Sequence, residues 1–120
     1  MAVLAIFKYE VKPGRLPDFM KKLAEAAEPK FTSPVMPKSV RVLRASVPGP
    51  DTMVMVIIEH EDMAAYGART AFELANKDWQ RLFEPSATAP EKLVSVELLT
   101  EVAPELGADA DKVPFGFRPE

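Results

Sequence analysis

The sequence predicts one α+β domain in which two helices pack on a four-stranded antiparallel sheet. Strand-like and helix-like patterns alternate over residues 2–102 in the order βαββαβ. A chain of 120 residues is long enough for one hydrophobic core and too short for two. Hydrophobic residues make up 48% of the chain and charged residues 28%, which is typical of a globular protein.

The first strand and the first helix are predicted over residues 2–11 and 16–27. Residues 2–11 carry apolar side chains on both alternating faces, the pattern of a strand in the centre of a sheet. After a Lys-Pro-Gly turn, apolar residues recur at helical spacing. Pro17 suits the first turn of this helix, and Pro29 should end it.

The second and third strands are predicted over residues 39–47 and 52–60. Two prolines make residues 30–38 a predicted loop, and Pro-Gly-Pro-Asp at 48–51 predicts the turn between the strands. The run TMVMVIIEH at 52–60 shows no polar alternation before its end, so this strand should be buried on both faces.

The second half of the chain predicts a helix, a short extra helix and a last strand. Asp62 is a good N-cap for the second helix. Trp79 is followed by apolar residues at helical spacing, which predicts the extra helix, and residues 92–102 supply the fourth strand. The residues expected to form the buried stripe of the second helix are Met63, Tyr66, Gly67, Thr70, Ala71, Leu74 and Ala75.

This element order is the split βαβ, or ferredoxin-like, arrangement. Right-handed crossovers then place both helices on one face of the sheet, with strand order 4-1-3-2. The domain is expected to span residues 2–102. Prolines and glycines predict an irregular C-terminal arm over residues 103–120, attached to the surface or to a partner subunit through Val113, Phe115 and Phe117.

The sheet is expected to need a second cover, because its strands are apolar on both faces and two helices cover only one. A second copy of the chain is the simplest symmetric cover, so the sequence predicts a homodimer joined through sheet faces. Which residues lie on the face without helices depends on the register of the strands. That face would carry several residues of one of two sets: Leu4, Ile6, Val54, Val56 and Ile58, or Met53, Met55 and Ile57.

Charge and cysteine content exclude several classes of function. The formal net charge is −3 and the basic residues are scattered, so we expect neither nucleic acid nor a membrane as a partner. The sequence contains no cysteine and one histidine. This excludes disulfides and thiol nucleophiles, and we expect no metal site, no cofactor and a cytoplasmic location.

One long segment carries a family resemblance. Residues 59–83 read EHEDMAAYGARTAFELANKDWQRLF, with an acidic strand end, a helix that opens Asp-Met-Ala-Ala-Tyr-Gly, and a downstream Asp-Trp-Gln-Arg-Leu. Together with Lys-Pro-Gly-Arg at 12–15, Phe19 and Ser-Val-Arg-Val-Leu-Arg at 39–44, this segment resembles NIPSNAP-like proteins of the dimeric α/β-barrel superfamily. The resemblance covers about residues 2–102.

The resemblance implies a homodimer whose two sheets face each other as a barrel, and a small pocket in each subunit. Relatives include cofactor-free monooxygenases, polyketide-modifying enzymes and haem-degrading enzymes. A shared fold therefore does not identify the reaction of this protein. Haem-degrading relatives need a histidine on the second helix, and residues 63–75 contain none.

Five residues are candidates for lining a ligand pocket. His60 lies at the end of a buried strand between two glutamates, where an imidazole could act as a base. A surface histidine without a catalytic role, at the junction of strand and helix, fits the same pattern. If the hairpin is centred on Pro50, Arg41 opposes Glu59 and Arg44 is left for a ligand or for an interface salt bridge. The candidates for aromatic walls are Tyr9, Tyr66 and Trp79.

Three functions are consistent with the sequence. The first is a dimer that binds an apolar or aromatic small molecule without a cofactor. The second is a cofactor-independent monooxygenase or a polyketide cyclase-like enzyme, and the third is a purely structural or regulatory dimer. The sequence does not reveal whether the protein is an enzyme or which ligand it takes, and the presence of a cavity separates the third function from the others.

Overall fold

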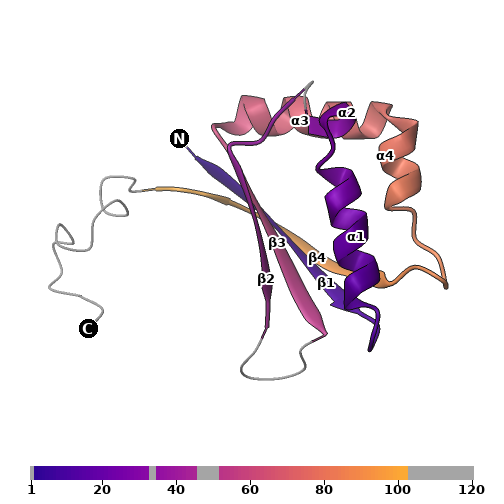
Figure 1. The fold of residues 1–120 in the computed structure, drawn as a ribbon. Helices are drawn as coiled ribbons and strands as arrows, with labels where there is room; N and C mark the ends of the chain where they lie inside the picture. The colour runs from indigo at the N-terminus through magenta and orange to yellow at the C-terminus, as the bar shows by residue number, and fades with distance from the viewer. Residues whose placement is uncertain (1, 33–34, 46–51, 103–120) are drawn as a thin grey trace, which may run out of the picture.

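The computed structural model describes residues 2–32, 35–45 and 52–102, and these form the predicted four-stranded antiparallel sheet (Figure 1). The strands lie in the order β2-β3-β1-β4, which confirms the predicted topology. Their bounds are Val3–Val11 for β1, Ser39–Arg44 for β2, Met53–His60 for β3 and Glu91–Thr100 for β4. The predicted arm over residues 103–120 lies outside the described residues.

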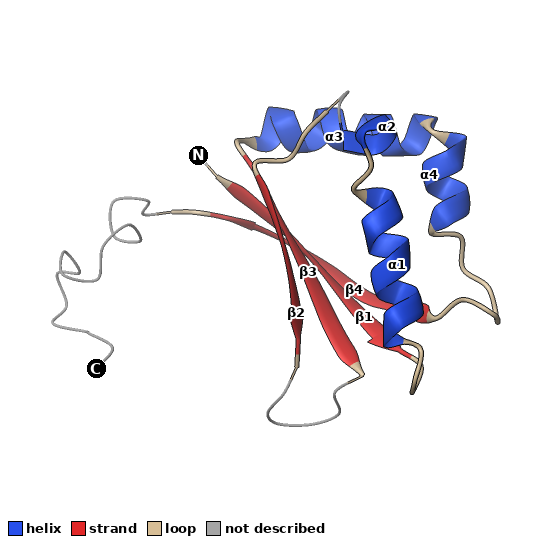
Figure 2. Cartoon of the chain, viewed as in Figure 1, coloured by secondary structure: helices blue, strands red, loops and turns tan. Residues whose placement is uncertain are grey.

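The helices gather on one side of this sheet, as predicted (Figure 2). They are α1 (Leu16–Ala26), α2 (Pro29–Thr32), α3 (Met63–Ala75) and α4 (Lys77–Leu82). No helix in the described part of the chain is long and apolar enough to cross a membrane.

The short helix α2 corrects the sequence prediction, which made residues 30–38 a loop. Pro29 ends α1, as expected, but it also begins α2. Proline suits a first helical position because its missing N–H would have no partner there. The turn buries Phe31, whose side chain is 2% exposed, against the helix layer.

The core lies between the sheet and α1. Phe19 of α1 is fully buried against Val11 of β1 and Val54 of β3. Tyr9, Leu16 and Leu23 pack around them. Complete burial of a side chain as large as phenylalanine contributes about 2–3 kcal/mol, so this cluster holds α1 on the sheet.

The register of β2 on β3 corrects a second prediction. Arg41 lies opposite Ile57, and Glu59 lies opposite Ser39, whereas the sequence analysis paired Arg41 with Glu59. Glu59 instead accepts a hydrogen bond from Ser39 at 3.3 Å and lies 3.6 Å from the Lys38 ammonium. The prediction was off by two residues, which keeps every side chain on its expected face because the period of a strand is two.

Helix α3 is rotated relative to the predicted stripe. Met63 and Leu74, which were expected to be buried, are 52% and 71% exposed. Arg69 takes the buried position instead and is 7% exposed. The rotation has a physical reason, because Arg69 reaches hydrogen-bond acceptors on α3 and on the segment that follows α2, which no apolar side chain could satisfy.

The face of the sheet turned away from the helices, which we call the open face, has an apolar centre bordered by polar and charged residues. Near the centre of this face, Lys8 and Glu97 form an ion pair with a distance of 3.0 Å between ammonium and carboxylate, the one such pair there among the described residues. None of the described elements covers this face (Figure 2). Its apolar members, assigned from strand register, are Leu4, Ile6, Leu43, Met53, Met55, Ile57 and Leu99.

Candidate functional site

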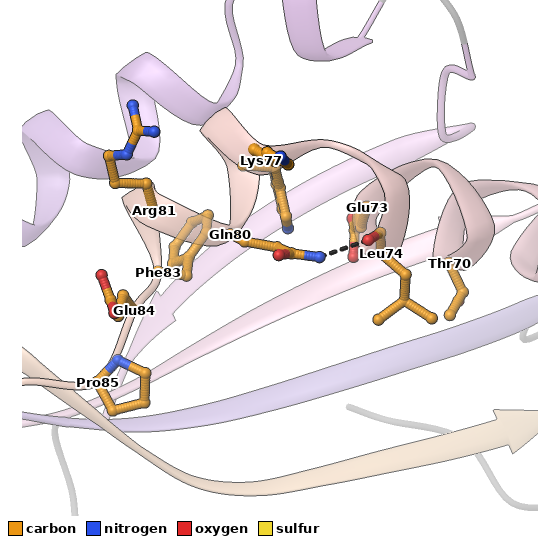
Figure 3. Close-up of a pocket in the computed structure, with 10 residues that line it drawn as sticks. Thr70, Glu73, Leu74, Lys77, Gln80, Arg81, Phe83, Glu84 and Pro85 are labelled. Carbon is orange, nitrogen blue, oxygen red and sulfur yellow. Dashed lines mark hydrogen bonds between the residues drawn. The ribbon is translucent and has the colours of Figure 1, made fainter.

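A groove of about 540 Å³ lies in the angle between α3 and α4 (Figure 3). We call it the α3–α4 groove. Its lining comes from the last turns of α3, from α4 and from the segment that follows α4. The lining residues are Thr70, Glu73, Leu74, Lys77, Trp79, Gln80, Arg81, Phe83, Glu84 and Pro85.

The angle between the two helices is set by Asn76. This residue ends α3 in an extended conformation, with φ −99° and ψ 109°, so the chain changes direction. Its carboxamide oxygen accepts a hydrogen bond from the Trp79 backbone N–H at 3.0 Å and caps α4. The Gln80 carboxamide donates to the Leu74 carbonyl, which ties α4 to the end of α3 (Figure 3).

Trp79 forms an aromatic wall of the groove and is held by three neighbours. Its ring meets Phe31 edge-on at 5.3 Å between centroids and Phe83 at 4.9 Å. The Arg69 guanidinium lies 4.8 Å from the Trp79 ring centroid. Contacts of this kind add to the burial energy of an aromatic residue and restrict its rotamers, so the wall is preformed.

Arg69 connects α3 to α2 through a set of buried hydrogen bonds. Its Nε donates to the Glu73 carboxylate at 2.8 Å, and its Nη1 donates to the carbonyls of Val35, at 3.0 Å, and Phe31. The sequence analysis missed Arg69. An Arg and a Glu four residues apart on a helix usually form a solvated surface pair, so their spacing gave no sign of burial.

Polar side chains from β1, α1, α3 and β4 form a group that we call the inner polar layer: Tyr9, Lys22, Arg69, Glu73 and Glu91. The Lys22 ammonium donates to both carboxylate oxygens of Glu91 at 2.9 Å. The side chains of Lys22 and Glu91 are 15% and 6% exposed. The charges of this pair therefore balance inside the fold.

Two members of the inner polar layer have shifted pKa values. Burial, followed by the negative charges of Glu91 and Glu73, raises the pKa of Tyr9 well above its usual value. Burial raises the pKa of Glu73, against the opposing hydrogen bond and charge of Arg69. Tyr9 is therefore a neutral phenol, while Glu73 is a carboxyl group that lines the groove and can exchange a proton.

The five residues that the sequence predicted to line a pocket lie at different places in the structure. Trp79 lines the α3–α4 groove. Tyr9 packs on Phe19 with ring centroids 4.9 Å apart. Arg44 lines a smaller cavity of about 270 Å³.

His60 and Tyr66 form a separate pair. Their rings meet edge-on at 5.5 Å between centroids. His60 is 4% exposed, and burial, then the charge of Arg69, lowers its pKa. Strand register places His60 beside Val3, at the end of β3 opposite to Arg44, so His60 and Arg44 do not face one cavity.

Comparisons of the sequence found no relative. No family model matches this chain, and no curated protein does.

Comparisons of the structure found solved neighbours at low sequence identity. An uncharacterized NIPSNAP-like domain protein from Burkholderia xenovorans is 20% identical, covers 82% of this chain and 81% of its own, and has a TM-score of 0.59. A putative antibiotic biosynthesis monooxygenase from Bordetella bronchiseptica is 21% identical, covers 84% and 97%, and has a TM-score of 0.58.

A third solved neighbour is a mutant of MhuD with two manganese protoporphyrin IX molecules bound per active site. It is 19% identical, covers 81% of this chain and 89% of its own, and has a TM-score of 0.55. At these identities the neighbours show the fold alone. The fold expected from the sequence resemblance, that of NIPSNAP-like proteins, is confirmed.

Proposed function

We propose that this protein, which has the fold of NIPSNAP-like proteins, binds an apolar or aromatic small molecule in the α3–α4 groove. The observation that carries the proposal is the groove itself, whose volume of about 540 Å³ falls in the range of small-molecule sites. Trp79, Phe83 and Leu74 supply apolar walls, and Glu73 supplies a polar group that can orient a ligand.

Preformed walls favour binding because little side-chain entropy remains to be lost. Trp79 is held by Phe31, Phe83 and Arg69. Leu74 is 71% exposed, so a ligand that covers it would remove apolar surface from water. A planar ring stacked along this wall would use both features.

The proposal includes a homodimer in the cytoplasm. The apolar open face supports the dimer, because a monomer rarely exposes a continuous apolar patch above about 300–600 Å². A second copy of the chain would cover this face symmetrically. The absence of cysteine is compatible with a reducing compartment.

A cofactor-independent monooxygenase or polyketide cyclase-like enzyme is a second candidate function, and Glu73 is the observation that favours it. Oxygenation without a cofactor needs an ionised substrate, because the substrate anion supplies the electrons to oxygen. A carboxyl group with a raised pKa beside an aromatic wall could take the proton of an activated phenol or enol. The Bordetella neighbour is a putative antibiotic biosynthesis monooxygenase, which supports this candidate.

Binding can be tested through Trp79, the only tryptophan in the chain. Its indole N–H gives a single NMR cross-peak, and we expect 2-methoxynaphthalene to shift that peak. Leu74→Arg should weaken binding at least about 10-fold, because it places a charge on an apolar wall. Met63→Arg is the matched control, since Met63 is also an exposed apolar residue of α3 but lies outside the groove lining.

Two results would contradict the binding proposal. One is an indole peak left unchanged by both 2-methoxynaphthalene and 2-naphthol near their solubility limits, and the other is an equal effect of Leu74→Arg and Met63→Arg. Turnover is tested separately by oxygen uptake with 1,5-dihydroxynaphthalene, without added metal or flavin. Uptake no faster than the uncatalysed rate would remove the monooxygenase candidate for this substrate class and leave the binding proposal standing.

A further inference from the structure

We propose that Glu73 selects the ligand of the α3–α4 groove by accepting a hydrogen bond from a hydroxyl group on an aromatic ring. The groove would then prefer a neutral phenol to an ether or a carboxylate built on the same ring. This inference rests on the proposed function and names the ligand class of the same site.

The first step of the argument is the position of Glu73 relative to Trp79. Both residues line the groove. Both also contact Arg69, whose Nε lies 2.8 Å from the Glu73 carboxylate and whose guanidinium lies 4.8 Å from the Trp79 ring centroid. A carboxylate and an indole ring that share one guanidinium neighbour lie close enough for one small aromatic molecule to meet both.

The second step concerns three nitrogen donors near the inner wall of the groove, on Arg69, Gln80 and Lys22, which are already in use. Arg69 directs its Nη1 to two backbone carbonyls, and its side chain is 9% exposed. The Gln80 carboxamide donates to the Leu74 carbonyl. Lys22 donates to both oxygens of Glu91. A ligand that brings its own donor can therefore hydrogen-bond to Glu73 without displacing these contacts.

The charged groups at the rim do not alter this preference. Arg81 lies 3.5 Å from Asp78 in an exposed pair, and Glu84 and Lys77 are rim residues of opposite charge. Charges at a solvated rim interact weakly because water screens them. The partly buried Glu73 carboxylate, 25% exposed, is screened less.

The third step is the energetic consequence for different ligands. A phenol offers Glu73 a charge-assisted hydrogen bond, a type that typically changes affinity about 10-fold or more. An ether has no donor, so it shields the carboxylate from water and leaves it with Arg69 as its partner. An aryl carboxylate adds a second negative charge beside Glu73, so it should bind weakest.

The preference should also depend on pH. Burial raises the pKa of Glu73, while Arg69 opposes the shift, and Tyr9, Glu91, Lys22 and Lys77 are the other charged or titratable groups near it. Below this pKa, the protonated carboxyl group becomes a donor. The aryl carboxylate should then bind better as the pH falls.

The experiment compares 2-naphthol, 2-methoxynaphthalene and 2-naphthoate by calorimetry at pH 7.5, with the Trp79 indole peak as the site-specific readout. We expect 2-naphthol to bind about 10-fold more tightly than 2-methoxynaphthalene, and 2-naphthoate to bind weakest. Glu73→Gln should reduce the preference for 2-naphthol over 2-methoxynaphthalene to under about 3-fold. Glu25→Gln, the same change at an exposed residue of α1 outside the groove lining, should leave it intact.

Glu73→Asp is the second variant, because Glu73→Gln also removes the charge that pairs with Arg69. Aspartate keeps this charge but draws the carboxylate back by one methylene. We expect it to reduce the preference at least about 3-fold. Equal binding of the three probes, or a preference that survives in both Glu73 variants, would overturn the inference and leave the groove as a binding site. If no probe shifted the Trp79 peak, the proposed function itself would fail.

Discussion

The two faces of the sheet are built from the same strands but bury their side chains in different ways. On the helix side, polar groups such as Arg69, Glu73 and the Lys22–Glu91 pair are drawn inward and satisfied by defined partners. The open face has an apolar centre, and no described element covers it. Hydrogen-bonded groups specify one geometry, whereas apolar surface specifies only that it be covered.

The strongest test of this contrast is a charge placed on the open face. Ile57→Asp should raise the dissociation constant of the proposed dimer at least about 100-fold, because the new carboxylate and Arg41, which lies opposite on β2, would have to leave water together in the interface. Light scattering at micromolar concentration should then return a mass near 13.2 kDa for the variant only.

Val40→Asp is the matched control for this test. Val40 lies on the neighbouring strand, on the other face of the sheet, and is 52% exposed. This substitution should leave the mass of the dimer unchanged. A wild-type mass near 13.2 kDa would contradict the dimer and the proposed role of the open face.

The helix side should respond most strongly to the loss of Arg69. Arg69→Met removes the guanidinium that pairs with Glu73 and bonds two carbonyls. We expect a loss of about 3 kcal/mol in the free energy of unfolding, because a partly buried carboxylate and two carbonyls lose their partner. Urea denaturation at one protein concentration measures it.

The control for Arg69 is Arg81→Met, which removes an arginine from an exposed pair with Asp78. Its effect should stay below about 0.5 kcal/mol. Equal effects of the two substitutions would mean that the inner polar layer contributes no more than a surface pair does.

A smaller effect is expected from the protonation of His60. Because burial lowers its pKa below the usual 6.5, the folded protein binds fewer protons at this site than the unfolded chain does. This contribution to stability is constant above pH 6.5 and is lost as the pH falls from 6.5 through the folded pKa.

His60→Phe keeps an aromatic ring beside Tyr66 and removes the titration. The urea midpoint of the wild type should therefore fall more between pH 7.5 and pH 5.5 than that of the variant. Glu73 acts in the opposite sense, since its raised pKa favours the folded protein at lower pH, and it is present in both proteins. Parallel pH profiles would contradict the assignment to His60.

The smallest effect is expected from the charged pair on the open face. Lys8 and Glu97 are 3.0 Å apart, and their side chains are 35% and 46% exposed. At a protein concentration below the dissociation constant of the proposed dimer, a double-mutant cycle with Lys8→Met and Glu97→Gln should give a coupling energy under about 1 kcal/mol. A clearly larger coupling would show that this face is covered even in the monomer.

The candidate site was partly accessible from the sequence. Trp79 was expected in an extra helix from its spacing with Leu82 and Phe83, and it lines the α3–α4 groove. Glu73 and Arg69 were missed, because an i, i+4 Arg–Glu pair is the ordinary pattern of a solvated helix face. Only the chain that packs against α3, at Phe31 and Val35, makes Arg69 a buried residue.

By itself, the sequence determined the order of the elements, the order of the strands and the apolar character of both sheet faces. These properties follow from local periodicity and from the handedness of crossovers. The tertiary structure alone decided the rotation of α3, the two-residue offset of β2 on β3 and the groove beside α4. Periodicity states which side chains share a face, but contacts between residues far apart in the chain decide what that face meets.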